Sequence, residues 1–307
     1  MTNSLCLGGY RTPTEGMEWS KIKRYLLPVS SQGCSMRISQ MVAAILLAGS
    51  LLDVAPLPAQ EVDWHQRFAE QAAKYELSHR ESGATFEMLE KPILHYTTPT
   101  RMGGDGSVFL WTDQSAPVAI GTCFTYVYQG RTNRKNAFNV LTNQPIKAVY
   151  EKQTVWMPPE NAIGFKAIPN APPPAENPRS RETQMRGLSR QFSLEVTNRD
   201  GRVEQCRLMS KPLYSYETED RTGSLFSFAV GTDPEAVLMI EQSADSSGKP
   251  QWHYAWARFS FYPLTAKHRG IEVWRKEGSE NLRGSLLLRT DYQQERYITF
   301  RPEYIEN

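Results

Sequence analysis

Residues 224–241, SLFSFAVGTDPEAVLMIE, decide the fold class of this chain. Two apolar runs, 224–230 and 236–240, flank the connection GTDPE at 231–235. Gly, Asp and Pro are the residues that tight turns favour, and Thr and Asp side chains bond the amides of such turns. Because both runs have the length of a strand and the connection is short, the stretch predicts an antiparallel hairpin.

Strand patterns continue on both sides of this hairpin. In 117–128 the side chains of alternate residues from Val118 to Tyr128 share one face, and in 251–262 the bulky residues Trp252 and Trp256 share another. Further strands are predicted at 107–112, 146–150, 154–157, 164–168, 192–197, 202–209, 213–217, 271–274, 285–289 and 297–300. So many short strands predict a large antiparallel sheet that curls into a half-barrel, a barrel or a sandwich. No internal repeat of fixed period is evident.

Two helices are predicted. The first covers 61–77, where apolar residues recur at three- and four-residue steps. The second covers 180–192, with Ser180 as its cap and an apolar stripe formed by Met185, Leu188 and Phe192. A proline-rich segment, PNAPPPAENP at 169–178, precedes it and predicts an extended crossing within one domain or a linker between two. The predicted fold class is therefore α+β, with a mainly antiparallel curved sheet and two packed helices.

The N-terminal part predicts export. Residues 36–59 combine a basic start, an uncharged apolar run and small residues before Gln60, which is typical of a secretory signal peptide. The apolar run is too short to span a bilayer, so we expect no membrane span in the mature chain. If 36–59 is a signal peptide, residues 1–35 are an over-extended start or a disordered leader, and 60–307 form a single β-rich domain that is periplasmic or extracellular. The alternative interpretation of the apolar run is a buried core helix.

The charge balance excludes one class of partner. The chain carries 35 Lys and Arg against 33 Asp and Glu, and the surplus lies in the part expected to be removed. Non-specific nucleic-acid binding depends on a large positive surplus. We therefore expect no nucleic acid as a partner.

Signatures of common enzyme classes are missing from the sequence. It has no G-x-S-x-G elbow, no phosphate-binding Walker loop, no H-E-x-x-H and no C-x-x-C pair. The remaining nominees for acid–base chemistry are the carboxylates Asp233, Glu235 and Glu241, with His253 as a base. A well-formed turn explains 231–235 equally, and we favour that interpretation. No cofactor or metal site is predicted.

Two further residue sets have a functional and a structural interpretation. Arg181, Arg186 and Arg190 lie off the apolar stripe of the second helix, as an anion-binding face or as an ordinary solvated face, which we favour. Cys123 and Cys206 lie in predicted strands of an exported chain and would form either a disulfide or two separate buried thiols. Neighbouring strands are required for the disulfide.

Several stretches resemble a family of exported proteins of planctomycete bacteria. They are FLWTDQSAPVAIGT at 109–122, the proline- and arginine-rich run at 163–193, the hairpin at 224–241, and WHYAWARFSFYPL at 252–264. The family has no assigned activity. The resemblance implies bacterial origin and export, and it supplies no catalytic residues.

These observations favour a non-catalytic exported protein that binds a small ligand or an envelope protein. The alternatives are an exported hydrolase acting through the carboxylates and a lipid carrier with a half-barrel fold.

Overall fold

The structure is a computed structural model that describes residues 63–97, 104–245, 247–278, 295–300 and 303–305. The predicted leader, the predicted signal peptide and the predicted strand at 285–289 lie outside these ranges. Among the described residues, no helix has the length and apolar character needed to cross a membrane.

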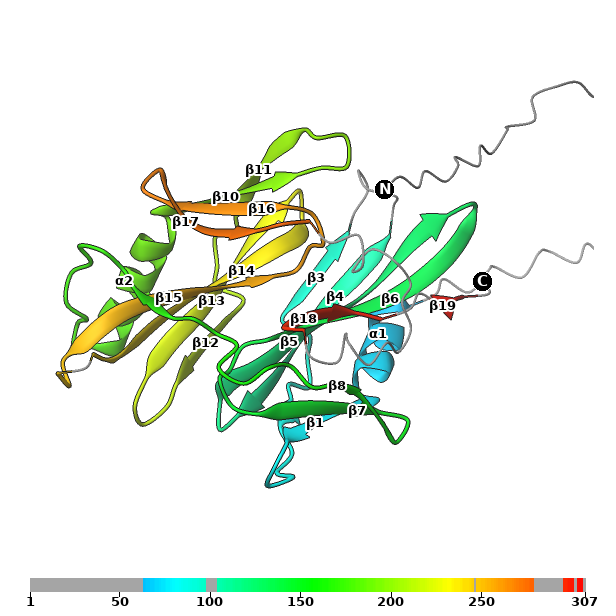
Figure 1. Ribbon diagram of the computed structural model, residues 1–307, viewed down its shortest axis with the longest axis horizontal. Coiled ribbons are helices and arrows are strands. Elements are labelled where there is room, and N and C mark those ends of the chain that lie inside the picture. Colours follow the sequence, from blue (N-terminus) through cyan, green and yellow to red (C-terminus); the bar gives the residue numbers. More distant parts are fainter. Residues whose placement is uncertain (1–62, 98–103, 246, 279–294, 301–302, 306–307) are drawn as a thin grey trace, which may run out of the picture. The chain divides into compact units, whose positions relative to one another are not determined.

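The described chain is built from two structural repeats (Figure 1). Each repeat is one helix followed by eight strands, and the order of pairing is similar in both, with two sheets in the first repeat and one continuous sheet in the second. The first repeat consists of α1 (Trp64–Ala72), β1 (Tyr75–His79), β2 (Glu87–Met88), β3 (Leu94–Thr97), β4 (Asp105–Asp113), β5 (Ala116–Tyr128), β6 (Arg131–Val140), β7 (Ile146–Tyr150) and β8 (Gln153–Trp156). The second consists of α2 (Pro178–Ser189), β10 (Phe192–Thr197), β11 (Val203–Leu208), β12 (Tyr214–Glu217), β13 (Thr222–Val230), β14 (Asp233–Ala244), β15 (Pro250–Arg258), β16 (Leu264–His268) and β17 (Ile271–Lys276).

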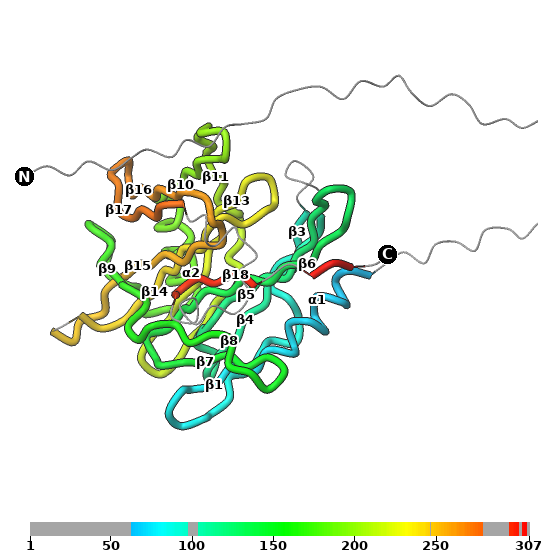
Figure 2. The backbone as a smooth tube through the Cα atoms, turned by 45° about the vertical axis from the view of Figure 1, so that its right-hand side comes forward, coloured from blue at the N-terminus to red at the C-terminus, as the bar shows by residue number. Residues whose placement is uncertain are grey.

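Three short strands lie outside the repeats. β9 (Lys166–Ala167) pairs with β15, and β18 (Tyr297–Thr299) and β19 (Glu303–Tyr304) pair with β6. The proline-rich crossing lies between β9 and α2 and contains no strand. In Figure 2 the chain runs through the first repeat from blue to green and through the second from light green to orange.

Most strand pairs recur in the two repeats with the same irregularities, but β10 forms a ladder with β11 whereas β1 is joined toward β2 only by an isolated bridge between Ser78 and Thr85. β1 pairs with β7 and β7 with β8, as β10 pairs with β16 and β16 with β17. The β7–β8 ladder is bulged after Ala148, and the β16–β17 ladder is bulged after Ala266. Likewise, β4–β5 is bulged after Trp111 and β13–β14 after Phe228. The structure therefore reveals a repeat, although the sequence shows none of fixed period.

The repeat signal is present in short matching stretches. KPILHYT at 91–97 corresponds to KPLYSYE at 211–217, and PIKAVYEKQTVW at 145–156 corresponds to PLTAKHRGIEVW at 263–274. These stretches are separated by segments with little similarity, which hides the repeat from a search for a strict period.

The same contact between a tyrosine ring and a glycine recurs in both repeats, and it requires glycine at the covered position. The Tyr96 ring lies over Gly106 on the neighbouring strand, and the Tyr216 ring lies over Gly223. A Cβ added at Gly106 would lie 2.2 Å from the Tyr96 ring, and one at Gly223 would lie 2.4 Å from the Tyr216 hydroxyl. Only glycine lets these tyrosines cover the strand so closely.

Both central strand pairs are buried on two faces. In β4, Phe109 and Trp111 pack toward α1 and the β1–β7–β8 sheet, whereas Val108 and Leu110 belong to a different cluster. In β13 and β14, alternate residues likewise divide between a cluster with α2 and the cluster that contains Val108. The shared cluster joins the two repeats and contains Tyr96, Val108, Leu110, Ile120, Leu141, Ile163, Leu225, Val237, Met239, Ala255, Ala257 and Phe259.

Reciprocal hydrogen bonds also join the repeats. The Ser115 hydroxyl, at the β4–β5 turn, donates to the Glu217 carbonyl over 3.0 Å. The Thr232 hydroxyl, at the corresponding β13–β14 turn, donates to the Thr97 carbonyl over 2.7 Å. Since Ser115 corresponds to Thr232 and Glu217 to Thr97, the contact has the form of an isologous interface, as in a two-fold dimer.

The predicted α+β fold class, with a curved antiparallel sheet and two packed helices, is confirmed. The predicted hairpin at 224–241 is also confirmed, with Val230 opposite Asp233 and Gly231 at φ 63°. Two helix boundaries are wrong. The first helix ends at Ala72 because β1 then pairs with β7, and the second begins at Pro178, capped by Asn177 instead of Ser180.

The two cysteines form no disulfide and lie in different repeats. Cys123 lies in the cluster under α1 and Cys206 in the cluster under α2, so the disulfide alternative is wrong. Burial raises the pKa of the Cys123 thiol to about 12, which keeps it protonated at neutral pH.

Gly106→Ala and Gly223→Ala are expected to lower the free energy of unfolding by about 1–3 kcal/mol each, the usual cost of overpacking. Gly187→Ala is the control, because a Cβ there meets nothing within 4 Å and the residue is helical. That change is expected to stabilise the protein by up to about 1 kcal/mol. Urea unfolding of the three variants measures the differences. A neutral Gly106→Ala would contradict the role of the tyrosine contact.

The buried Lys135 on β6 is expected to make the free energy of unfolding depend on pH. Burial lowers its pKa from the ordinary 10.5 to about 8. Between these values the unfolded chain binds more protons than the folded chain, so stability due to this group rises with pH. From pH 7 to 9.5, the wild type is expected to gain about 2 kcal/mol relative to Lys135→Met. Comparing the two proteins cancels the tyrosines that titrate in the same range, and parallel pH curves would contradict the prediction.

Candidate functional site

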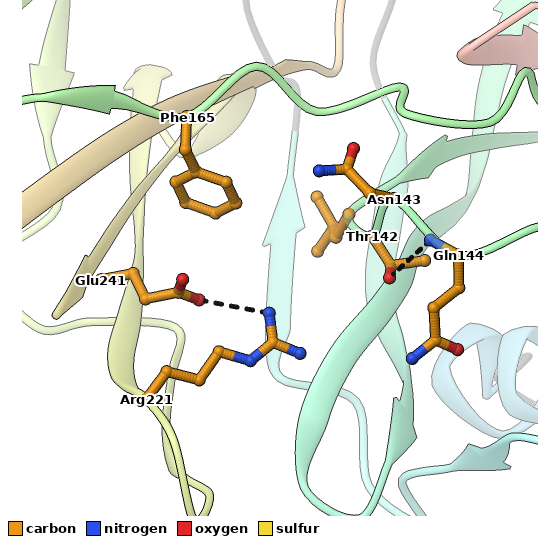
Figure 3. A pocket seen from close by; sticks show the side chains of 7 residues that line it. Thr142, Asn143, Gln144, Phe165, Arg221 and Glu241 are labelled. Atoms are coloured by element: carbon orange, nitrogen blue, oxygen red, sulfur yellow. Dashed lines mark hydrogen bonds and ion pairs between the residues drawn. The ribbon is translucent and has the colours of Figure 1, made fainter. Parts of the chain in front are cut away.

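A polar pocket lies between the two repeats (Figure 3). Its volume is about 440 Å³. One wall is the connection between β6 and β7, residues 141–144, and the other is formed by Arg221 and Glu241 of the second repeat, with Phe165 beside them. The lining therefore combines a hydroxyl, two amides, a guanidinium, a carboxylate and one aromatic ring.

Glu241 is the buried acidic group of this pocket. Its side chain is 6% exposed, and its Oε2 accepts a hydrogen bond of 2.6 Å from the Tyr216 hydroxyl. Burial raises the pKa of this carboxyl, whereas the Tyr216 hydrogen bond and the Arg221 charge lower it. Burial outweighs the other two causes, so the pKa of Glu241 is raised, and its carboxyl accepts one short hydrogen bond, from Tyr216.

The guanidinium of Arg221 has N–H groups that are not hydrogen-bonded to its two acidic neighbours, Asp220 and Glu241. Its Nη1 lies 3.6 Å from Glu241 Oε2 and its Nε 3.9 Å from Asp220 Oδ1, both beyond hydrogen-bond distance. The Nε is buried and has no hydrogen-bond partner among the described residues. Leaving such a group unsatisfied is costly. A guanidinium with unused donors at the edge of a pocket is suited to bind an oxygen-rich ligand.

The polar side chains of residues 142–144, on the opposite side of the pocket, are held in place by hydrogen bonds, two of them from backbone amides. The Asn143 Oδ1 accepts from the Ile163 amide over 2.8 Å, and the Thr142 hydroxyl accepts from the Gln144 amide over 3.2 Å. The Gln144 side chain donates to Asp113 over 3.4 Å. These contacts hold the polar groups of the connection in place opposite Arg221.

Comparison of the repeats shows that the buried carboxylate of Glu241 has no counterpart among the described residues of the first repeat. Gly106 and Gly223 correspond, so the strand register places Phe124 where Glu241 lies. The Tyr96 hydroxyl bonds the Thr122 hydroxyl over 2.8 Å, whereas the Tyr216 hydroxyl bonds a carboxylate. Comparing the repeats in the sequence would have singled out Glu241. Tyr216, Arg221 and the amides were missed because strand patterns carry no signal for a pocket between distant segments.

Glu241 is not brought together with the other two nominated carboxylates, Asp233 and Glu235. All three lie along the continuous strand β14, with Glu241 six residues beyond Glu235. At about 3.3 Å rise per residue that separation is roughly 20 Å. Asp233 closes the turn, and the Glu235 carbonyl accepts amides of the β15 end. His253 lies opposite Glu241 on β15, where its Nδ1 contacts the Ser243 hydroxyl at 3.0 Å, outside the residues that line the pocket.

The nominated arginines do not converge either. Arg181 donates to the Ala175 and Glu176 carbonyls and to Glu217, so its guanidinium ties α2 to the preceding crossing and to β12. Arg186 pairs with Glu182 one turn away. Arg190 is the exposed C-cap of α2. Structural contacts and exposure to solvent therefore account for Arg181, Arg186 and Arg190 without an anion-binding face.

Comparisons with known proteins assign no family. No family model matches the chain, and no curated protein matches it in sequence. Among solved structures, the chain is similar to a crystal structure of a variant GH36 alpha-galactosidase AgaA from Geobacillus stearothermophilus in complex with raffinose. The identity is 9% and the TM-score 0.19, over 66% of this chain and 29% of that chain. The resemblance to planctomycete exported proteins stays a prediction.

Tyr216→Phe is expected to destabilise the protein by about 1.5–3 kcal/mol at pH 7, because a buried carboxylate loses its donor. Tyr96→Phe is the matched control in the other repeat and is expected to cost about 1 kcal/mol, since it removes a bond between two neutral hydroxyls. Lower pH protonates Glu241, which no longer needs the donor. The deficit of Tyr216→Phe should therefore narrow from pH 8 to 4.5, while that of Tyr96→Phe stays constant. If urea unfolding shows that both variants lose the same stability and that the loss does not change with pH, the predicted difference between the two tyrosines is contradicted.

Proposed function

We propose that the protein is a non-catalytic binding protein that holds a small, neutral, polyhydroxylated molecule in the pocket between its repeats. The observation that carries this proposal is Arg221, whose guanidinium lines the pocket beside Glu241, with Nη1 3.6 Å from the carboxylate and so beyond hydrogen-bond distance. Export to the periplasm or the exterior, proposed from residues 36–59, is consistent with such a role.

The balance of groups in the pocket favours a neutral ligand. Arg221 and the amides of Asn143 and Gln144 supply donors, whereas the Glu241 carboxylate supplies acceptors. An anionic ligand would approach Glu241 unfavourably, and a cation would approach Arg221 unfavourably. A ligand with several hydroxyl groups can donate to Glu241 and accept from Arg221 at once, and its apolar face can lie on Phe165.

The two alternatives are less well supported. A hydrolase acting through the nominated carboxylates requires two of them about 5–10 Å apart in an open cleft. Asp233 and Glu235 are about 7 Å apart along β14, but Glu235 is only 1% exposed and neither residue lines the pocket. Glu241, which does line it, lies much farther along the strand. A lipid carrier requires an apolar, roomy interior. The space between the central strands is instead filled by the shared cluster that joins the repeats.

Binding is tested by calorimetric titration of the chain from residue 60 with a panel of neutral mono- and disaccharides. Saturable binding of at least one is expected. Arg221→Gln and Glu241→Gln are each expected to weaken that binding at least 10-fold, because a buried ligand hydroxyl would lose its partner. The control is Arg202→Gln, a side chain that is 70% exposed on a different surface.

Two outcomes would overturn the proposal. One is the absence of binding across the sugar panel. The other is binding that survives in both pocket variants, which would place the ligand elsewhere. A parallel titration with free amino acids distinguishes a zwitterionic ligand, which would contact the same Arg221 and Glu241 but contradict the polyhydroxylated class.

A further inference from the structure

Two histidines of the first repeat meet at one buried serine. His65 lies in the first turn of α1, and His95 lies on β3 directly opposite Ser107 of β4. The Ser107 Oγ is 3.2 Å from His65 Nδ1 and 2.9 Å from His95 Nδ1. The centroids of the two imidazole rings are 3.9 Å apart. A helix and a strand far apart in the sequence thus bring two imidazoles into contact.

The second repeat shows that the fold does not require these histidines. The residues that correspond to His95 and Ser107 are Ser215 and Ser224, which face each other in the same way across β12 and β13. Their hydroxyls are 2.8 Å apart. Two serines therefore satisfy this position of the strand pair. The histidine pair is an addition of the first repeat that strand pairing alone does not explain.

The hydrogen bonding of the pair leaves ring nitrogens available. A serine oxygen has two lone pairs and can accept an N–H from each ring. If both histidines carry their proton on Nδ1, both donate to Ser107 and both Nε2 lone pairs are available to a ligand. Ser107 is fully buried, whereas both histidines are exposed. The ring edges that do not contact the serine are therefore open to solvent.

We propose that His65 and His95 together bind one divalent transition-metal ion, such as Zn²⁺, through their Nε2 atoms, with Ser107 as the shared acceptor that orients both rings. Metal-binding histidines usually donate their other N–H to such an acceptor. Zn–N bonds are about 2.0–2.1 Å long, so two neighbouring rings can contact one ion. Among the described residues, no group of three or more His, Cys, Asp and Glu could hold a metal. The two imidazoles are the ligands that the described residues supply, with water completing the coordination.

The test is equilibrium dialysis of the metal-stripped chain from residue 60 against Zn²⁺ alone. Saturable binding of one ion is expected for the wild type. His65→Gln and His95→Gln are each expected to weaken it at least 10-fold, and Ser107→Ala by about 10–100-fold, the usual effect of losing an orienting acceptor. His253→Gln, which removes a histidine of the other repeat, is expected to change nothing.

A second measurement keeps the proposal independent of the folding of the variants. The chain has five histidines, so their ring proton signals are few enough to follow by NMR. Zn²⁺ is expected to shift those of His65 and His95 and leave the other three in place. Absence of saturable binding, or shifts confined to other histidines, would overturn the proposal. The sugar titration with the pocket variants is unaffected by either result, so the two proposals fail separately.

Discussion

The packing of the two central strand pairs on each other is the constraint on which the rest of this structure depends. β4 and β5, like β13 and β14, carry large apolar side chains on both faces. A strand pair of this kind exposes one apolar face however well its own helix covers the other. Each repeat therefore needs the other, and the shared cluster is where both needs are met. The reciprocal bonds of Ser115 and Thr232 fix the register of that contact.

The repeated architecture also explains where function has room to develop. Positions that the fold requires are the same in both repeats, such as the glycines under Tyr96 and Tyr216. Positions that differ are free of that requirement. Among the described residues, a tyrosine bonded to a buried carboxylate, Tyr216 with Glu241, is found in the second repeat, and the His65–His95 pair is found in the first. One duplicated scaffold thus carries two unrelated polar sites. A site argued from such a difference has the other repeat as its internal control.

Strand positions were largely predictable, because burial on alternate faces imposes a period of two. The predicted 146–150 and 192–197 coincide with β7 and β10. β6, RTNRKNAFNV, was missed because Asn133, Lys135 and Asn136 interrupt its apolar pattern although all three are buried. Tyr75 and Leu77 were assigned to a helix because their spacing continues that of α1, yet pairing with β7 makes this segment a strand. Local periodicity does not register a partner strand that lies far along the chain.

The sequence by itself determined the α+β class, the central hairpin and the antiparallel character, since these follow from side-chain alternation and turn chemistry within a few residues. It nominated Glu241 but grouped it with Asp233 and Glu235, because proximity along the chain was the only proximity available. Only the tertiary structure decided that Glu241 faces Tyr216 and Arg221, and that Cys123 and Cys206 lie in separate cores. The physical reason is pairing between segments distant in the sequence: β12 and β14 both pair with β13, which brings Tyr216 beside Glu241. The extended backbone of β14 separates Glu235 from Glu241, and each repeat buries its cysteine under its own helix.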